Sequence, residues 1–131
     1  MYTLGHNFNP ANIHAGGLRH HGAGVIVSQL LKDSYMYGMD IPQLENFEAG
    51  TLFSHTEGII PAPESCHAIA AAIREAKKEK ETGKEDVFLF CLSGHGLIDM
   101  TAYNTYINGD LRNYTLTDED VEKNLGTVPK I

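Results

Sequence analysis

The clearest hydrophobic pattern in the chain predicts a helix between Pro63 and Gly83. Its apolar residues recur every three or four positions, which places them on one helical face: Cys66, Ile69, Ala70, Ile73 and Ala76. The opposite face is charged through residues 77–80. Gly83 is suited to end the helix, because glycine readily adopts the left-handed conformation that closes helices. The segment is therefore predicted to be an amphipathic helix.

Weaker patterns predict four further helices. They fall in residues 23–34, residues 45–54, a segment that begins near Met100, and residues 117–126. The last segment has Thr117 in the N-cap position and acidic residues in its first turn, both of which favour a helix start. Residues 39–44 are expected to form a short strand. Residues 1–22 contain four glycines and no hydrophobic period, so they predict a long loop.

The fold class is inferred from residues 87–92, which read VFLFCL. This apolar run is bounded by charged residues on one side and by Ser-Gly on the other, as is typical of a strand covered on both faces in a parallel sheet. Together with the helices, it predicts an α/β fold in three layers, with helices flanking a short, mainly parallel sheet. The chain shows no linker or internal repeat, so residues 1–131 are expected to form one domain.

Composition and charge narrow the classes of function. The chain carries 10 Lys and Arg residues against 17 Asp and Glu, a formal net charge of −7, which argues against nucleic acid as a partner. No apolar run approaches the ~18 residues of a membrane span, and the first residues lack the features of a signal peptide. A cytoplasmic protein without a membrane partner is therefore expected. Cys66 and Cys91 are not in a CxxC pair and are expected to be reduced.

Seven histidines are many for a chain of 131 residues, and four of them lie within the first 21 positions. None of these four, His6, His14, His20 and His21, has the helical spacing or the neighbouring carboxylates of a typical zinc site. We expect these histidines to hydrogen-bond loop backbone or to line a pocket.

Two local features are candidates for a functional site. The turn at residues 93–96 follows the predicted strand, and ligands of open α/β sheets collect at the carboxyl ends of strands. The same four residues are equally consistent with a plain strand-to-helix turn. Glu57 lies between two predicted helices and beside apolar residues, an environment in which carboxylates often serve a site. An ordinary loop acid is the alternative.

Three ordered motifs resemble one enzyme family. The strings HAGGLR at 14–19, EGIIPAPESCHAIAAAI at 57–73 and LSGHG at 92–96 resemble the C-terminal third of the tryptophan synthase β chain. They are most similar to its divergent second branch, which carries Arg after the AGGL turn and His in the SGHG turn. The resemblance extends over nearly all 131 residues.

The resemblance implies a fold-type II enzyme that holds pyridoxal phosphate. It places Ser93 at the pyridine nitrogen of the cofactor, with Gly94 in the same turn. Glu57 would lie beside the cofactor ring, and Gly17 would lie in the same wall. A neutral hydroxyl at the ring nitrogen leaves the ring unprotonated, which suits β-elimination over transamination.

The resemblance also implies roles near the AGGL turn. The carbonyl oxygens of Leu18 and His20 match positions that help to bind a monovalent cation. Arg19 stands where the main branch has an Asp that contacts the substrate hydroxyl, so Arg19 is the substrate candidate. Because Arg favours anionic groups, a substrate with a carboxylate or phosphate becomes conceivable. Leu97 replaces a polar residue usual after the SGHG turn.

Several parts of the family site lie upstream of the segment that the resemblance covers. They are the Schiff-base lysine, the Gly-rich phosphate loop and the carboxylate that handles indole. The seven lysines of this chain mostly lie in polar helix or tail patterns: Lys32, Lys77, Lys78, Lys80, Lys84, Lys123 and Lys130. Met1 resembles an internal methionine of a longer enzyme. The chain is therefore expected to be a partial domain that is incomplete at its N-terminal side.

The expected function is that of the C-terminal part of an enzyme that replaces the β-substituent of serine, or a related amino acid, with indole to give tryptophan. Alone, the chain should be inactive, since it lacks the lysine. Two alternatives stay open. The chain could be a non-catalytic module that self-associates, or one half of a split enzyme. A homo-oligomer is expected, whereas docking of an α subunit is left open.

Overall fold

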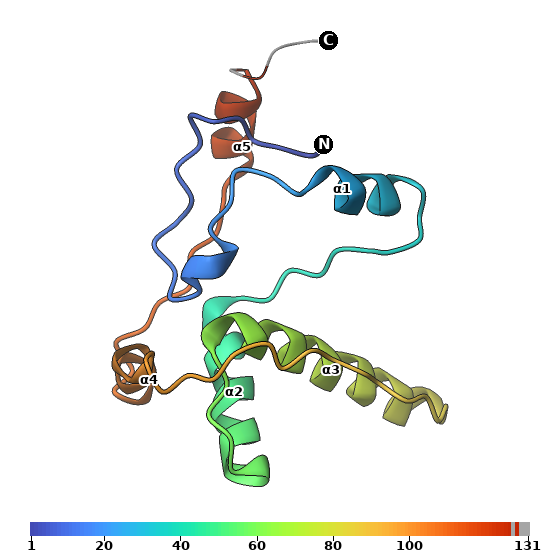
Figure 1. The fold of residues 1–131 in the computed structure, drawn as a ribbon, viewed down its shortest axis with the longest axis vertical. Coiled ribbons are helices and arrows are strands. Elements are labelled where there is room, and N and C mark those ends of the chain that lie inside the picture. Colours follow the sequence, from blue (N-terminus) through green and yellow to red (C-terminus); the bar gives the residue numbers. More distant parts are fainter. Residues whose placement is uncertain (127, 129–131) are drawn as a thin grey trace. The chain divides into compact units, whose positions relative to one another are not determined.

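A computed structural model describes residues 1–126 and 128. Within these residues the secondary structure is helical, with a short 3-10 helix, η1, and five α-helices (Figure 1). Their bounds are η1 Gly16–Leu18, α1 Val25–Lys32, α2 Gln43–Glu57, α3 Pro63–Thr82, α4 Met100–Ile107 and α5 Asp118–Leu125.

The chain divides into two compact units. The first comprises Met1–Ile13, Gly17–Asp40 and Tyr114–Ile131, and the second comprises His14–Gly16 and Ile41–Asn113. Helices α1 and α5 belong to the first unit, and α2, α3 and α4 belong to the second. Each unit is described by itself.

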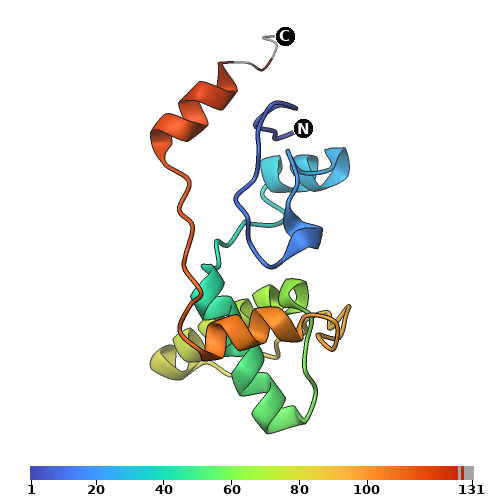
Figure 2. The ribbon, with the colours of Figure 1, turned by 90° about the vertical axis from the view of Figure 1, so that its left-hand side faces the viewer.

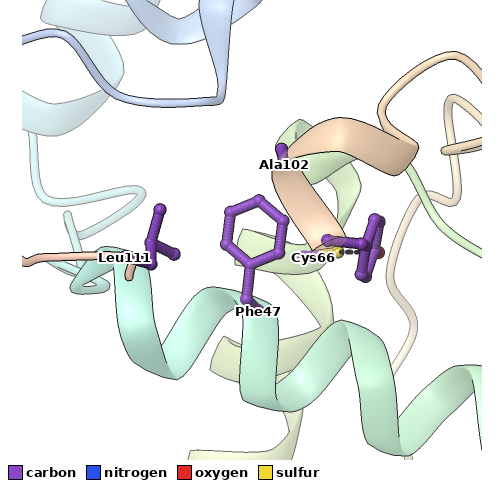
Figure 3. Close-up of a cluster of buried hydrophobic side chains, with 5 residues drawn as sticks. Phe47, Cys66, Ala102 and Leu111 are labelled. Atoms are coloured by element: carbon purple, nitrogen blue, oxygen red, sulfur yellow. Dashed lines mark hydrogen bonds between the residues drawn. The ribbon is translucent and has the colours of Figure 1, made fainter. Parts of the chain in front are cut away.

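The core of the second unit lies where α2, α3 and α4 meet. Figure 2 shows α4 crossing α2, and Figure 3 shows the buried side chains between the helices. They are Phe47, Cys66, Ala102, Tyr103 and Leu111. The ring of Phe47 meets the ring of Tyr103 edge to face, with centroids 5.1 Å apart, and stacks on Tyr106 at 5.8 Å. Aromatic packing therefore joins α2 to α4.

The helix predicted between Pro63 and Gly83 is confirmed. Pro63 stands in the first turn of α3, where its missing N–H costs nothing. Gly83 follows the last helical residue with a φ of 71°, and its N–H donates to the carbonyl of Glu79. Residues Cys66, Ile69 and Ala70 are buried, as the pattern predicted.

The other predicted helices are confirmed with small changes of length. Helix α5 begins with a capping box, in which Thr117 accepts from the N–H of Asp120 and the Asp120 carboxylate accepts from the N–H of Thr117. Helix α2 extends beyond the predicted residues 45–54 at both ends and closes at Gly58, whose φ is 71°.

The short strand predicted at 39–44 is wrong, because α2 already begins at Gln43. The side chain of Gln43 is buried between distant backbone groups. Its Oε1 accepts from the N–H of His14 at 2.9 Å, and its Nε2 donates to the carbonyl of Arg112 at 2.7 Å. Contacts between residues far apart in sequence thus decide this helix start, and the local pattern does not contain them.

The apolar run 87–92 is extended but forms no strand, and the described residues contain no sheet. Phe88 and Phe90 line a groove against α2 and α3, along which the run lies (Figure 1). Val87 and Leu89 point away and are 97% and 96% exposed. The predicted parallel sheet is therefore absent from the described part. A strand requires a neighbour to accept and donate its backbone hydrogen bonds, and among residues 1–126 and 128 none lies beside this run.

The long loop predicted at 1–22 is confirmed apart from η1, and it is closed at its ends. Thr3 and Gly22 form an isolated antiparallel bridge. Beside the bridge, the N–H of Leu4 donates to the carbonyl of His21 at 2.9 Å. A Cβ at Gly22 would lie 2.4 Å from the carbonyl oxygen of Tyr2, so the close approach of the two ends of the loop requires glycine.

None of the described helices has the length and the apolar character needed to cross a membrane.

Candidate functional site

The turn at residues 93–96 is fastened to the connection between α2 and α3. Pro61 and His95 form an isolated antiparallel bridge. On either side of it, the N–H of Ala62 donates to the carbonyl of Gly94 at 2.9 Å, and the N–H of Gly96 donates to the carbonyl of Ile60 at 2.7 Å. These backbone bonds hold the turn in one register against the start of α3.

The two glycines of the turn permit this approach. A Cβ at Gly96 would lie 2.4 Å from the carbonyl oxygen of Pro61, and a Cβ at Gly94 would lie 3.2 Å from the Cβ of Ala62. Glycine is therefore required at position 96 for the backbones to meet.

Ser93 opens the turn and its side chain is exposed. Its Oγ lies 3.3 Å from the Oγ of Ser65, a residue in the first turn of α3 that is 2% exposed. The same Ser65 Oγ accepts a hydrogen bond from the N–H of Gly94 at 3.2 Å. The exposed hydroxyl of Ser93 is thus in hydrogen-bond contact with the buried hydroxyl of Ser65.

Two further polar side chains lie beneath the turn. The hydroxyl of Tyr103 donates to the carbonyl of Pro61 at 2.7 Å, and the thiol of Cys66 lies 3.3 Å from the same hydroxyl (Figure 3). Because the single proton of the Tyr103 hydroxyl goes to Pro61, the Cys66 thiol is the donor in the second contact. Gly50 makes room for this pair, since a Cβ there would lie 2.5 Å from the Cys66 sulfur.

Burial keeps both of these groups protonated. It raises the pKa of the Tyr103 hydroxyl and the pKa of the Cys66 thiol, because the charged form of each would be poorly solvated. A thiol of raised pKa is a poor nucleophile. The arrangement therefore supports the backbone of the turn and does not itself supply a reactive group.

Glu57 is the last residue of α2, and its side chain is exposed. The next residue, Gly58, ends the helix, and Ile60 two residues later bonds to the turn through its carbonyl. The second unit thus contains Glu57, Ser93 and Gly94 among the predicted site residues.

The remaining predicted site residues belong to the first unit. Gly17 and Leu18 lie in η1, and the carbonyl of Leu18 accepts from the N–H of His20 at 3.0 Å. The guanidinium of Arg19 donates to the carbonyl of Pro10 at 3.1 Å. A second guanidinium nitrogen contacts the side-chain oxygen of Asn12 at 3.4 Å, while the Nε of Arg19 is buried without a partner. Arg19 thus hydrogen-bonds to residues 10 and 12 and stabilises the N-terminal loop of its unit.

Side chains that commonly bind metals do not gather in the described residues. No group of three or more His, Cys, Asp and Glu side chains that could hold an ion occurs there. His20 lines a broad pocket of the first unit, and the Nδ1 of His95 accepts from the N–H of Leu97 at 3.3 Å.

Comparison with known proteins identifies relatives of the chain. No protein-family model matches it. Tryptophan synthase beta chain 2 of Thermotoga maritima is 60% identical to it over 103 residues, which are 79% of this chain and 24% of that protein. The protein of the same name from Aquifex aeolicus is 57% identical over 111 residues, 85% of this chain and 26% of that protein. This chain is homologous to tryptophan synthase beta chain 2.

A third relative, tryptophan synthase beta chain 2 of Methanothermobacter thermautotrophicus, is 47% identical over 111 residues, 85% of this chain and 26% of that protein. The resemblance inferred from the three motifs is therefore confirmed. The chain spans about a quarter of the length of these tryptophan synthase beta chains. The roles predicted for individual site residues stay predictions.

Two residues of the turn's support were not singled out from the sequence. Ser65 lies inside the family-like string 57–73, and Tyr103 lies on the apolar face of α4. A serine in the first turn of a helix is ordinarily a local capping residue. Ser65 is the third residue of α3 and not its N-cap. Its hydroxyl is therefore not needed to cap the helix and can bond to another segment, which is the signal that could have identified it.

Proposed function

We propose that this chain supplies one side of the pyridoxal phosphate site in an enzyme of the tryptophan synthase beta type. That enzyme would join indole to serine, or to a related amino acid, to give tryptophan. The observation that carries the proposal is the exposed Ser93 hydroxyl, held by Ser65 on a turn fastened to the start of α3. Homology to tryptophan synthase beta chain 2 supports it.

The residues of the turn fit the proposed cofactor. Pyridoxal phosphate needs a hydrogen-bond partner for its ring nitrogen, and the Ser93 hydroxyl is exposed and anchored on one side only. A neutral hydroxyl there does not stabilise a protonated ring. When bound, the cofactor serves as an electron sink for bonds at the α-carbon of the amino acid. Gly94 has no side chain to contact Ala62, so the turn can pack closely on that residue. The exposed Glu57 is proposed to lie beside the cofactor ring.

Three further roles are proposed for the first unit. Gly17 would complete the wall of the cofactor site, and the carbonyls of Leu18 and His20 would bind a monovalent cation. Arg19 would contact an anionic group of the substrate. Since its guanidinium already donates to Pro10, this role requires Arg19 to exchange or share that contact.

The chain alone is proposed to be inactive. A lysine that forms a Schiff base must be desolvated so that its amine loses its proton. Six lysines are exposed in the structure: Lys32, Lys77, Lys78, Lys80, Lys84 and Lys123. Lys130 lies outside the described residues. The remaining polypeptide of the enzyme would supply the lysine and the strands that pair with residues 87–92, which gives the α/β layer that the sequence predicts.

A chimera tests the proposal. This chain replaces the matched region in the Thermotoga maritima relative, and tryptophan formation from serine and indole is measured with pyridoxal phosphate present. We expect the chimera to bind the cofactor and to form tryptophan, and the Ser93→Ala chimera to be slower. The isolated chain serves as the control and should form none. A folded chimera that binds no cofactor contradicts the proposal, as does turnover by the isolated chain above that of its Ser93→Ala variant.

Self-association is the second candidate function, and residues 87–92 favour it. Val87 and Leu89 are almost fully exposed, and the backbone of this extended run has no strand beside it in the described residues. Such an edge can pair with the same edge of a second copy. On this view the chain is a non-catalytic module that forms a homo-oligomer.

Light scattering over a range of concentrations separates the two candidates. If the module self-associates, its mass rises with concentration and Leu89→Lys returns it to a monomer. The matched control is Ile107→Lys, which adds the same charge at another exposed apolar position, at the end of α4. A monomer at every concentration contradicts self-association.

A further inference from the structure

We propose that Ser65 is a positioning residue, which directs the hydroxyl proton of Ser93 away from the turn and toward a bound acceptor. The identity of that acceptor, a cofactor ring nitrogen, rests on the proposed function. The orientation of the hydroxyl rests on the hydrogen bonds around Ser65 alone.

The direction of these hydrogen bonds follows from counting donors. Ser65 Oγ accepts from the N–H of Gly94 at 3.2 Å, which leaves its own proton to be donated. Two acceptors lie near it, Ser93 Oγ at 3.3 Å and the Gly94 carbonyl at 3.5 Å. That carbonyl already accepts from the N–H of Ala62 at 2.9 Å. The nearer and less occupied acceptor is Ser93.

Ser93 Oγ therefore accepts a hydrogen bond from Ser65 and keeps its own proton for another partner. A hydroxyl carries one proton, so the Ser93 proton points to the exposed side of the turn. Successive hydrogen bonds from Gly94 to Ser65 to Ser93 also polarise one another, which makes the last hydroxyl a better donor.

The position of Ser65 makes this orientation rigid. It is 2% exposed and belongs to the first turn of α3, whose preceding residue Ala62 is paired with Gly94. The inner side of the Ser93 hydroxyl thus faces a buried group. A hydroxyl held as a donor favours an acceptor without a proton of its own, so Ser65 would bias a bound pyridine ring toward its unprotonated form.

The hold of Ser65 on the Ser93 hydroxyl is tested first on the chain itself, by NMR couplings between the α and β protons of Ser93, which report the rotamer that places its Oγ. We expect one side-chain rotamer in the wild type and averaging among rotamers in Ser65→Ala. Ser28→Ala is the matched control. Ser28 is a buried serine that also accepts a backbone N–H, that of Tyr2 at 3.0 Å, but it lies in the first unit. Unchanged couplings in Ser65→Ala, or averaged couplings in the wild type, overturn the inference.

A second measurement addresses the acceptor in the cofactor-loaded chimera. With pyridoxal phosphate labelled with ¹⁵N in the ring, we expect the nitrogen signal of an unprotonated ring, shifted in Ser65→Ala. The loss of one hydrogen bond should lower kcat about fivefold with little change in KM. A chimera that binds no cofactor overturns the proposed function, while the couplings of the free chain still decide the role of Ser65. A nitrogen signal that Ser65→Ala leaves unmoved overturns its role toward the ring.

Discussion

The hydroxyl of Tyr103 donates a hydrogen bond to the carbonyl oxygen of Pro61, 42 residues earlier in the chain, at 2.7 Å. Pro61 also pairs with His95 in the turn that carries Ser93. A buried side chain of α4 thus reaches the backbone segment on which the candidate site turn lies. The packing of the core and the geometry of the turn are therefore linked through one peptide group.

Removing the Tyr103 hydroxyl should destabilise the second unit. Tyr103→Phe keeps the ring against Phe47 but leaves the buried carbonyl of Pro61 without this donor and removes the contact between the hydroxyl and the Cys66 thiol. We expect a loss of about 1–3 kcal/mol in the free energy of unfolding, measured by urea denaturation. Tyr106→Phe, on the same helix and also packed on Phe47, is the control and should cost less. Equal losses in the two variants would contradict the role of the hydroxyl.

A methyl group at Gly96 should force the turn away from Pro61. Its Cβ would lie 2.4 Å from the Pro61 carbonyl oxygen, a backbone atom that cannot move aside without breaking the bridge to His95. Gly96→Ala should therefore lower the free energy of unfolding by about 1–3 kcal/mol. Thermal or urea unfolding checks this.

Gly38→Ala is the control for that substitution, because nothing lies within 4 Å of a Cβ at position 38. It should change the free energy of unfolding by no more than about 0.5 kcal/mol. If Gly96→Ala behaves like Gly38→Ala, the close contact with Pro61 does not constrain the turn.

The two cysteines should differ in reactivity toward a thiol reagent. Cys66 is buried, and burial raises the pKa of its thiol, whereas Cys91 is exposed. Titration of the native chain with a disulfide reagent at neutral pH should therefore modify one thiol quickly and the second only after denaturation. Cys91→Ser should remove the fast phase. A fast phase that persists in Cys91→Ser would show that Cys66 is accessible.

The ion pair between Glu45 and Arg74 should stabilise the second unit at neutral pH and lose its effect in acid. Two guanidinium nitrogens of Arg74 donate to the two carboxylate oxygens of Glu45, and this hydrogen bonding lowers the pKa of Glu45. A folded pKa below the unfolded value gives stability that is present above the unfolded pKa. That stability is lost as the pH falls through the folded pKa.

A double-mutant cycle with Glu45→Gln and Arg74→Gln measures this pair. Both side chains are about a third exposed, 34% and 33%, so solvent weakens their attraction. The coupling free energy should be no more than about 1 kcal/mol at pH 7. It should decrease as the pH falls below the ordinary glutamate range, near 4.5, through the lowered pKa of Glu45. A coupling that is independent of pH would contradict the assignment.

The local sequence predicted those helices whose signals lie within one or two turns. Gly83 closes α3 and Thr117 caps α5 through interactions with residues at most four positions away. The family was also evident from local strings, and homology to tryptophan synthase beta chain 2 confirms it. The prediction for residues 39–44 was wrong because the start of α2 depends on Gln43 bonding to His14 and Arg112.

By itself, then, the sequence determined the helices, the resemblance to tryptophan synthase beta chain 2 and the position of the turn that carries Ser93. Only the tertiary structure decided that residues 87–92 stay extended without a sheet in the described part, that Gly96 is required by Pro61, and that Ser65 holds Ser93. The physical reason is the range of the interactions. Helix formation and capping join neighbours along the chain, whereas strand pairing and the contacts of Ser65 join residues far apart in sequence, and only the packed chain brings those together.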